Sequence, residues 1–360
     1  MGKMVTLEFL SVFKARRVMI TGHTGFKGSW LAFLLNEVGA EVLGYALAPS
    51  DQKNHFDLLD LRKSIQHIEA DIRNDQKLKK TMCDFQPEFV FHLAAQALVR
   101  PSYDDPRLTF ETNVMGSVNL LEAVRACDSV RSLVYITSDK CYENLEWVWG
   151  YRENDRVGGH DPYSASKGAA EIAFSAYSRS FFLNRPGLGA ATTRAGNVIG
   201  GGDWAVDRII PDCIRAINSN EAIHLRNPAA TRPWQHVLEP LSGYLLLAAR
   251  LFEEPAGYGG AWNFGPPSSE VRTVLQVAEH IVKRFGPGTI TTDIVENKHH
   301  EAQLLQLNCD KANQNLNWYP RWDVEHTLDM TSDWYKKVNN GTPVIDVTRE
   351  QLREYFPELL

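Results

Sequence analysis

The feature that most constrains the fold is a glycine-spaced turn near the start of the chain. Residues 18–20 are apolar, as in a buried strand, and residues 29–35 continue with a helical pattern. Between them, Gly22, Gly25 and Gly28 recur at every third position. Glycines allow a tight turn, and the amino end of a helix offers N–H groups and a positive dipole to a phosphate. The pattern therefore predicts a strand–turn–helix unit that binds the pyrophosphate of a dinucleotide.

A second pattern places a tyrosine and a lysine after another buried strand. Residues 133–136 are apolar, and the polar residues 137–142 follow at the strand end where ligands bind in open α/β sheets. Pro162 is tolerated in the first turn of a helix, on which Tyr163 and Lys167 share one face. Because a nearby ammonium favours the phenolate, Tyr163 is a candidate general base assisted by Lys167.

Strand-like and helix-like segments alternate through the first half of the chain. The expected strands are 41–47, 68–73, 89–96 and 189–194, and a long helix is expected over 163–182. This alternation is typical of a parallel sheet covered by helices. We therefore predict an α/β protein, a Rossmann-type doubly wound parallel sheet with a smaller C-terminal α/β substrate domain.

Composition narrows the class of protein. With 44% hydrophobic and 23% charged residues, the 360-residue chain is expected to be globular, and its net charge of −6 gives no general attraction for nucleic acid or anionic membranes. The five cysteines are scattered, which favours reduced thiols in a cytoplasm. The first 16 residues lack the apolar core of a signal peptide, and no apolar run reaches the length of a membrane span. We expect a cytoplasmic protein without nucleic-acid or membrane partners.

Longer motifs carry a resemblance that spans roughly residues 14–335. These motifs are Gly22-His-Thr-Gly-Phe-Lys-Gly-Ser-Trp30, Thr137-Ser-Asp-Lys-Cys-Tyr-Glu-Asn144, Trp149-Gly-Tyr-Arg-Glu153 and Gly201-Gly-Asp-Trp204. With them the chain resembles the extended short-chain dehydrogenase/reductase superfamily, and within it the CDP-glucose 4,6-dehydratases. The resemblance implies residues 14–200 as an NAD-binding domain to which 236–268 return. Residues 201–235 and 269–340 would then bind the sugar nucleotide.

The implied reaction is the NAD-dependent dehydration of CDP-glucose to CDP-4-keto-6-deoxyglucose, in deoxysugar and surface-polysaccharide (O-antigen) biosynthesis. Tyr163 would take the C4 hydroxyl proton, and Thr137 would hydrogen-bond that hydroxyl. Loss of water from C6 needs a base at C5 and an acid at the C6 oxygen, which Asp139 and Lys140 lie close enough to supply. Most related dehydratases carry Asp-Glu here. Whether Lys140 is the C5 base or stabilises the enolate stays open, because a charged lysine accepts no proton.

The resemblance also assigns the binding residues. The expected NAD-binding residues are Gly22, Thr24, Gly25, Phe26, Lys27, Gly28, Asp71, Ile72, Leu93, Ala94, Ala95, Thr112, Tyr163 and Lys167. The expected substrate-binding residues are Arg100, Asn197, Trp204, Arg208, Arg232, Asn263 and His300. Ser50 and Asp51 are weak candidates for the adenosine ribose. His299, His300 and Glu301 have no evident third partner, so we predict no metal site. A homodimer or homotetramer is expected from the apolar surface of the 163–182 helix.

Two other functions remain open on the residues alone. A 4-epimerase of the same fold would use Tyr163, Lys167 and NAD without needing Asp139 and Lys140. A catalytically silent NAD-binding regulator would not need an intact set of Thr137, Tyr163 and Lys167. A dehydratase acting on another nucleotide-linked sugar also remains open, because no residue identifies the nucleobase.

Overall fold

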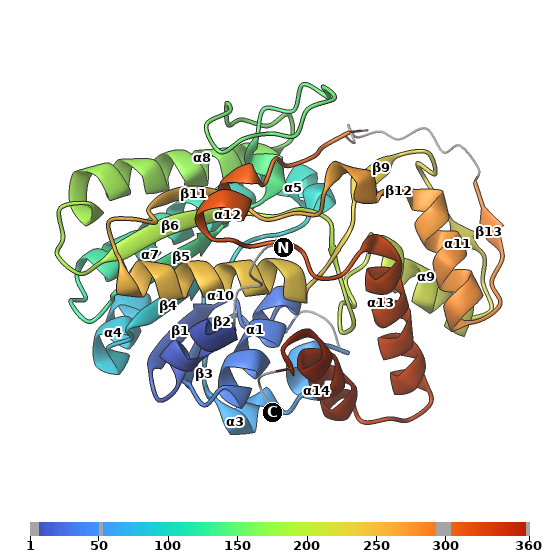
Figure 1. Cartoon of the computed structure of the whole chain (residues 1–360), viewed down its shortest axis with the longest axis horizontal. Coiled ribbons are helices and arrows are strands. Elements are labelled where there is room, and N and C mark those ends of the chain that lie inside the picture. The colour runs from blue at the N-terminus through green and yellow to red at the C-terminus, as the bar shows by residue number, and fades with distance from the viewer. Residues whose placement is uncertain (1–6, 50–52, 293–303, 358–360) are drawn as a thin grey trace.

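The centre of the molecule is a parallel sheet of seven strands (Figure 1). The computed structural model describes residues 7–49, 53–292 and 304–357. The strand order is β11 (Gly260–Asn263), β6 (Gly189–Arg194), β5 (Ser132–Ile136), β4 (Phe89–His92), β1 (Arg17–Thr21), β2 (Glu41–Ala46) and β3 (Gln66–Glu69). The order reverses direction between β1 and β4, and such a switch point opens a crevice for ligands at the carboxyl ends of the strands.

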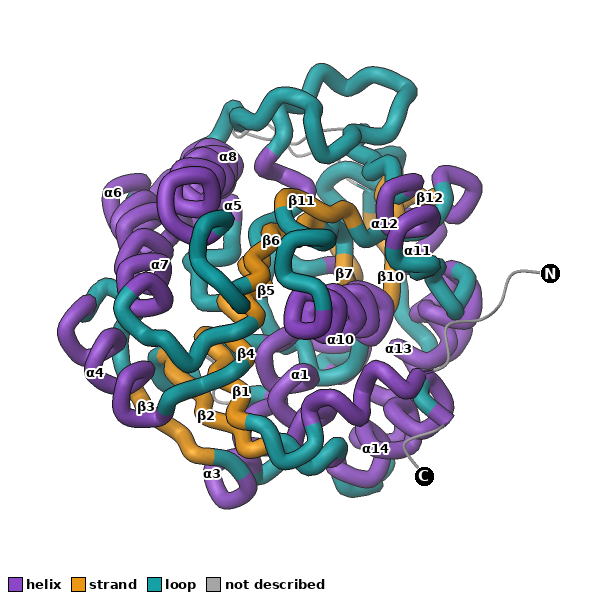
Figure 2. The backbone as a smooth tube through the Cα atoms, turned by 60° about the vertical axis from the view of Figure 1, so that its left-hand side comes forward, coloured by secondary structure: helices purple, strands orange, loops and turns teal. Residues whose placement is uncertain are grey.

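Helices cover both faces of the sheet, as predicted, and each face has its own core (Figure 2). One face carries α4 (Asp75–Phe85), α7 (Gly116–Arg125) and α8 (Pro162–Tyr177), and the other carries α1 (Phe26–Glu37) and α10 (Leu238–Glu253). β4 and β5 are buried along their whole length, which explains their continuous apolar sequences. The doubly wound α/β fold predicted from the alternating pattern is confirmed.

Several element boundaries differ from the sequence-based expectation. The strand expected over 68–73 is β3, which ends at Glu69, so that Asp71 lies in the turn that follows. The strand expected over 89–96 ends at His92, which leaves Leu93–Gln96 as loop. The long helix expected to reach Phe182 is α8 up to Tyr177, followed by a π-helical turn. A run of apolar residues does not mark where hydrogen bonding to the neighbouring strand stops, and this explains the difference.

The second half of the chain builds a smaller part beside the carboxyl edge of the sheet. It contains α9 (Ile209–Asn218), α11 (Val274–Phe285) and α13 (Val324–Asn339). Its strand pairs are β7 (Val198–Ile199) with β10 (Gln235–His236), β8 (Ile223–His224) with β13 (Ile290–Thr291), and β9 (Thr231–Pro233) with β12 (Val271–Thr273). α11 begins at Val274, directly after β12, which takes the three preceding residues.

Two later segments pack back on the first half of the chain. β11 joins the sheet as the edge strand beside β6, and α10 packs against β5 and β6. The last helix, α14 (Val344–Tyr355), packs on α2 (His55–Leu58), where Thr348 hydrogen-bonds His55 at 3.2 Å. The remaining helices are α3 (Leu61–Ser64), α5 (Val99–Asp104), α6 (Pro106–Phe110) and α12 (Asp310–Asn315), with 3₁₀ turns at Leu7–Phe13, Asp139–Cys141 and Ser268–Glu270 and π turns at Glu111–Met115 and Ser178–Phe182.

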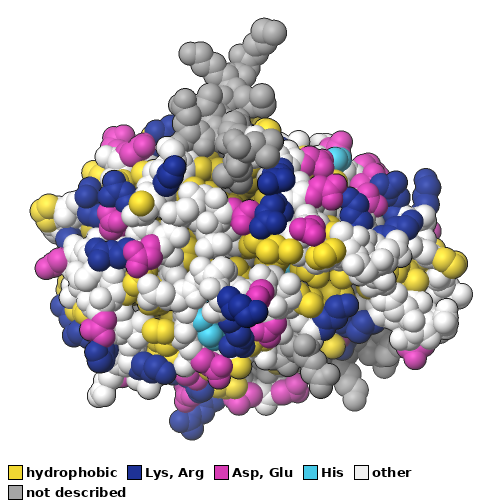
Figure 3. Space-filling view, turned by 90° about the horizontal axis from the view of Figure 1, so that it is seen from below, with side chains coloured by type: hydrophobic (Ala, Val, Ile, Leu, Met, Phe, Trp, Pro, Cys, Tyr) yellow, Lys and Arg dark blue, Asp and Glu magenta, His cyan; other side chains and the backbone are white. Residues whose placement is uncertain are grey.

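The surface mixes charges of both signs. On the face shown in Figure 3, lysine and arginine side chains alternate with aspartate and glutamate, and neither sign forms a continuous area. Among the residues that the structure describes, no helix is both long enough and apolar enough to cross a membrane.

Candidate active site

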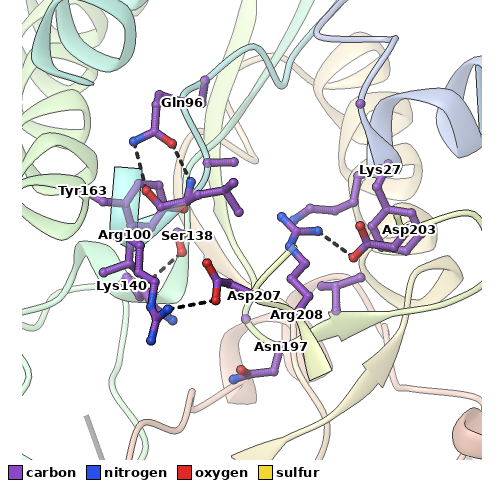
Figure 4. A pocket seen from close by; sticks show the side chains of 18 of the residues that line it. Lys27, Gln96, Arg100, Ser138, Lys140, Tyr163, Asn197, Asp203, Asp207 and Arg208 are labelled. Atoms are coloured by element: carbon purple, nitrogen blue, oxygen red, sulfur yellow. Dashed lines mark hydrogen bonds and ion pairs between the residues drawn. The ribbon is translucent and has the colours of Figure 1, made fainter. Parts of the chain in front are cut away.

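A large cavity lies at the carboxyl ends of the sheet strands, between the sheet and residues 195–235 (Figure 4). Its volume is about 1130 Å³. Pockets for one drug-sized ligand range from roughly 300 to 1,000 Å³. The cavity therefore has room for a dinucleotide and a second ligand.

The glycine turn forms one end of this cavity. Gly22 follows β1 with a φ of +78°, a conformation that side chains disfavour. A Cβ atom on Gly22 would lie 2.7 Å from the Ala94 nitrogen, and one on Gly28 would lie 2.1 Å from the Gly22 oxygen. Because the turn packs this tightly, α1 begins at Phe26 with its first turn against the cavity. This geometry fits a dinucleotide pyrophosphate at the helix amino end.

The residues expected to bind a dinucleotide gather along this part of the cavity. Its lining includes Gly22, Thr24, Gly25, Phe26, Lys27, Gly28, Asp71, Ile72, Leu93, Ala94, Ala95 and Thr112. The Asp71 carboxylate is bound by the Arg73 guanidinium at 2.7 Å, which lowers the pKa of Asp71. Ser50 and Asp51 lie outside the described residues.

Tyr163 and Lys167 lie in the first two turns of α8 and are both buried beside the cavity. Asp161 caps this helix by accepting a hydrogen bond from the Ser164 amide at 2.9 Å. Burial raises the pKa of Tyr163 to about 12, although a hydrogen bond with Ser138 acts in the opposite direction. Burial, together with the nearby Lys27 charge, lowers the pKa of Lys167 to about 8. The expected lowering of the Tyr163 pKa is therefore not found in this unliganded site, because desolvation outweighs the neighbouring charges.

The polar turn after β5 presents two hydroxyl groups in different directions. Thr137 donates a hydrogen bond from Oγ1 to Glu171 and a second, at 3.2 Å, to the Thr193 carbonyl. Ser138 lies against Tyr163 and donates from Oγ to Asp139 at 2.9 Å. Both residues line the cavity, but the Thr137 hydroxyl already has partners. The geometry thus gives Ser138, which the sequence analysis had passed over, the position expected of Thr137.

Asp139 and Lys140 continue this turn into the cavity. Asp139 is only 2% exposed, and its Oδ2 has no hydrogen-bond partner in the described structure. A Cβ on Gly196 would lie 1.9 Å from that oxygen, so only glycine leaves room for the carboxylate there. Lys140 lines the cavity and donates its amide to Ser138 Oγ at 3.2 Å.

A buried ion pair supports the turn from below. Glu171, on α8, accepts hydrogen bonds from Arg194 on β6 at 2.8 and 3.0 Å and from Thr192 at 2.9 Å. Its bond from Thr137 completes the set, so the carboxylate is surrounded by donors. A third bond from Arg194, at 2.7 Å, reaches the Tyr142 hydroxyl at the end of the turn. The pair therefore fixes both ends of residues 137–142.

The far side of the cavity is rich in arginine. Arg208 binds Asp203 at 2.8 Å, and Arg100 binds Asp207 at 3.0 Å (Figure 4). Arg232 also lines the cavity, as does Asn197, whose Nδ2 is buried without a partner in the described structure. These side chains offer N–H donors to anionic and polar groups of a ligand.

Comparison with known proteins places this fold and site in a family. The family model described as GDP-mannose 4,6 dehydratase matches residues 19–331. CDP-glucose 4,6-dehydratase of Salmonella typhimurium is 47% identical over 348 residues, which cover 96% of this chain and 97% of that protein. The chain belongs to the GDP-mannose 4,6-dehydratase family.

Solved structures of similar proteins share the architecture of this family member. UDP-glucose 4-epimerase from Thermus thermophilus, in complex with NAD, has a TM-score of 0.76 and 25% identity, and the match covers 89% of this chain and 99% of that one. dTDP-glucose 4,6-dehydratase from Bacillus anthracis, also with NAD, has a TM-score of 0.74 at 21% identity over 96% and 100% of the two chains. The second likeness shows the fold alone.

Two expected substrate residues of this family member, Asn263 and Trp204, do not line the cavity in the described structure. Asn263 is fully buried in β11, where its amide bonds Tyr142, at 2.8 Å, and two backbone carbonyls. Trp204 packs against Trp334 and Tyr335 outside the cavity lining. His300 lies outside the described residues. Asn263 and Trp204 therefore hold the fold around the site rather than line it.

Two residues of the site were missed in the sequence analysis. Ser138 could have been found from side-chain alternation, because neighbouring residues of an extended chain point to opposite sides, so that the hydroxyl groups of Thr137 and Ser138 have different surroundings. Arg226 follows β8, lines the cavity and binds Asp207. No signal in the sequence distinguishes Arg226 from a surface arginine.

Proposed function

We propose that this protein is an NAD-dependent CDP-glucose 4,6-dehydratase, which converts CDP-glucose to CDP-4-keto-6-deoxyglucose and water. The observation that carries the proposal is the meeting of Ser138, Asp139 and Lys140 with Tyr163 and Lys167 at one cavity beside the glycine turn. The Salmonella typhimurium relative named CDP-glucose 4,6-dehydratase supports the nucleobase and the sugar. NAD held at the glycine turn would supply the hydride chemistry of the reaction, which is oxidation at sugar C4 and reduction at C6.

The glycine turn supports NAD as the cofactor. The first turn of α1 would hold the pyrophosphate, the loop at Leu93–Ala95 would lie beneath the cofactor, and Asp71 and Ile72 would border the adenine. The pocket-lining Lys167 would bind the nicotinamide ribose. Residues 14–200 with 236–268 would thus form the cofactor part, and 201–235 with 269–340 the sugar-nucleotide part.

The first step is removal of a proton from the C4 hydroxyl. Tyr163 is the base, and Ser138 orients the sugar hydroxyl and the phenol through its own hydroxyl. With its pKa near 12, Tyr163 is protonated at neutral pH before catalysis. The charge of Arg208 already favours the phenolate, and Lys167, one turn further along α8, would add to this stabilisation when substrate and cofactor fill the site. Proton removal is therefore coupled to the filling of the cavity.

The second step is loss of water across C5 and C6. The C4 ketone acidifies the C5 proton, and the C6 hydroxyl needs a proton to leave as water. Asp139, which lines the cavity, would act as the acid toward the C6 oxygen. Lys140 is either the base that takes the C5 proton or an ammonium that holds the enolate oxygen at C4 while another group takes that proton.

The sugar nucleotide would be bound by the cavity-lining arginines and by Asn197. Arg100, Arg208 and Arg232 would bind the diphosphate through their guanidinium groups, and the Asn197 amide would bind the sugar or an adjacent oxygen. The product class implies deoxysugar and surface-polysaccharide synthesis. We further propose a cytoplasmic enzyme that works as a homodimer or a dimer of dimers.

An epimerase is the second candidate function. It is supported by CDP-paratose 2-epimerase of Salmonella typhi, which is 31% identical over 89% of this chain and all of that protein. A 4-epimerase needs no acid at C6, however, and the buried, unpartnered oxygen of Asp139 has no task in that reaction. The dehydratase reaction accounts for this oxygen.

Turnover of a panel of substrates tests the proposal. The full-length protein with NAD should convert CDP-glucose to a product that has lost one water and shows the alkali-induced absorbance of a 4-keto sugar. The kcat/KM values for dTDP-, UDP- and GDP-glucose should be at least ~10-fold lower than the value for CDP-glucose. Faster turnover of another nucleotide sugar would reassign the nucleobase, and an isomeric sugar of unchanged mass would favour the epimerase.

A further inference from the structure

A carboxylate bridges two arginines across the mouth of the cavity. Asp207 Oδ1 accepts a hydrogen bond from Arg100 Nη1 at 3.0 Å and another from Arg226 Nη1 (the first pair is drawn in Figure 4). Arg100 belongs to α5 beside the sheet, whereas Arg226 follows β8 on the opposite side. All three residues line the cavity. The bridge therefore joins the two parts of the molecule between which a sugar nucleotide must enter.

The single Asp207 carboxylate does not neutralise both arginines of the bridge. One carboxylate charge faces two guanidinium charges, which leaves the group of three with a net positive charge. The side chains are also 32–38% exposed to the solvent that fills the cavity, so each ion pair is worth little on its own. An anion with two charges matches the two arginines better than Asp207 does.

The backbone of Asp207 is held in an uncommon conformation. Its φ is +64°, in the left-handed region where aspartate and asparagine are tolerated but costlier than glycine. At this turn two successive residues have different partners. Asp207 binds Arg100 and Arg226, whereas Arg208, the next residue, binds Asp203. The loop before α9 thus presents one carboxylate and one guanidinium to different parts of the cavity.

We propose that Asp207 is an internal stand-in for the substrate diphosphate, which holds Arg100 and Arg226 in place and is displaced when a nucleoside diphosphate binds. Arg226 then becomes a diphosphate ligand in addition to Arg100. This inference rests on the proposed function, since it takes the substrate to be a sugar linked to a nucleoside diphosphate. Every binding event must break two ion pairs, so Asp207 weakens affinity and speeds release of the charged product.

The affinity of the NAD-saturated, full-length protein for CDP tests the proposal by titration calorimetry. Asp207→Asn keeps the size and the left-handed backbone but removes the competing charge, so CDP should bind about fivefold more tightly. Asp84→Asn is the matched control, because it removes the same charge from a surface pair with Lys80 remote from the cavity lining. Its affinity for CDP should equal that of the wild type.

A double-mutant cycle identifies the partner of Asp207. Arg226→Gln should weaken CDP binding about tenfold, and Asp207→Asn should gain less affinity in that background than in the wild type. Weaker CDP binding by Asp207→Asn would overturn the proposal, since Asp207 would then serve to order the arginines permanently. The proposal would also be overturned if Asp207→Asn increased the affinity for CDP as much in the Arg226→Gln background as in the wild type.

These measurements are separable from the proposed reaction. A protein that shows the affinity shifts with CDP but makes no 4-keto sugar would retain this inference and reject the dehydratase. A protein that makes the 4-keto sugar but shows no affinity shifts with CDP would retain the dehydratase and reject this inference. If CDP does not bind but UDP, dTDP or GDP does, the cycle is read with that nucleotide, and failure of all four to bind overturns the inference.

Discussion

Ser138 and Thr137 are neighbours in the sequence, but their hydroxyl groups have different surroundings. Ser138 lies against Tyr163, whereas Thr137 is tied to Glu171 beneath the site. Ser138→Ala should therefore lower kcat by about 10²-fold with little change in the free energy of unfolding. Thr137→Val should instead destabilise the fold by about 1–3 kcal/mol, because Glu171 loses a donor, while the stable fraction keeps most of its activity. Turnover and urea unfolding of both variants measure the difference, and the reverse pattern would restore Thr137 as the substrate-binding hydroxyl.

Asp139 and Lys140 can be separated by the exchange of the C5 proton. Lys140→Met keeps the length of the side chain but removes the amine, so C5 should take up deuterium from heavy water at least ~10²-fold more slowly. Asp139→Asn should allow this exchange and block loss of the C6 hydroxyl, because an amide supplies no acidic proton. Mass analysis of the recovered sugar nucleotide reports both steps. If Lys140→Met formed the product at the wild-type rate, the amine would have no chemical role.

At the scale of elements, the first turn of α1 carries an unusual charge. Burial and the nearby Arg208 lower the pKa of Lys27 from 10.5 to about 8. Between about pH 8 and pH 10.5 the unfolded chain therefore binds more protons at this position than the folded chain, so the lysine costs less stability as the pH rises. Without ligands, Lys27→Met should be more stable than the wild type near pH 7, by on the order of 1–3 kcal/mol, with the gap narrowing toward pH 10. A gap that widens with pH in urea unfolding would contradict this.

Elements with a strong local signal were predictable, and those fixed by partners were not. The glycine turn and the buried strands carry their own pattern, so β1, α1, β4 and β5 appear where the sequence indicated. β12, by contrast, exists because Thr231–Pro233 pairs with it, and no local pattern shows that partner. The same holds for side chains. Asn263 and Trp204 have the residue types of ligand-binding groups, but their hydrogen bonds and packing are satisfied inside the protein.

At the scale of the whole molecule, one surface lacks a partner. α6 and α8 pack together and leave apolar side chains exposed around them, among them Phe110, Ile172 at 61% and Phe181 at 47%. Burying such side chains against a second copy would stabilise a homodimer. Light scattering at micromolar concentration should give at least a dimer mass, and Ile172→Lys should weaken association about tenfold or more. Val148→Lys, at an apolar residue that is 75% exposed on a loop away from α8, is the control, and a monomeric wild type would contradict the prediction.

The fate of the hydrogen on sugar C4 tests the central claim most directly. CDP-glucose labelled with deuterium at C4 should yield a 4-keto sugar that has lost one water and carries the deuterium at C6, because oxidation, elimination and hydride return occur in one cavity. NMR and mass analysis of the product locate the label. Deuterium retained at C4 in a sugar of unchanged formula, or a 4-keto product with no deuterium at C6, would contradict the account.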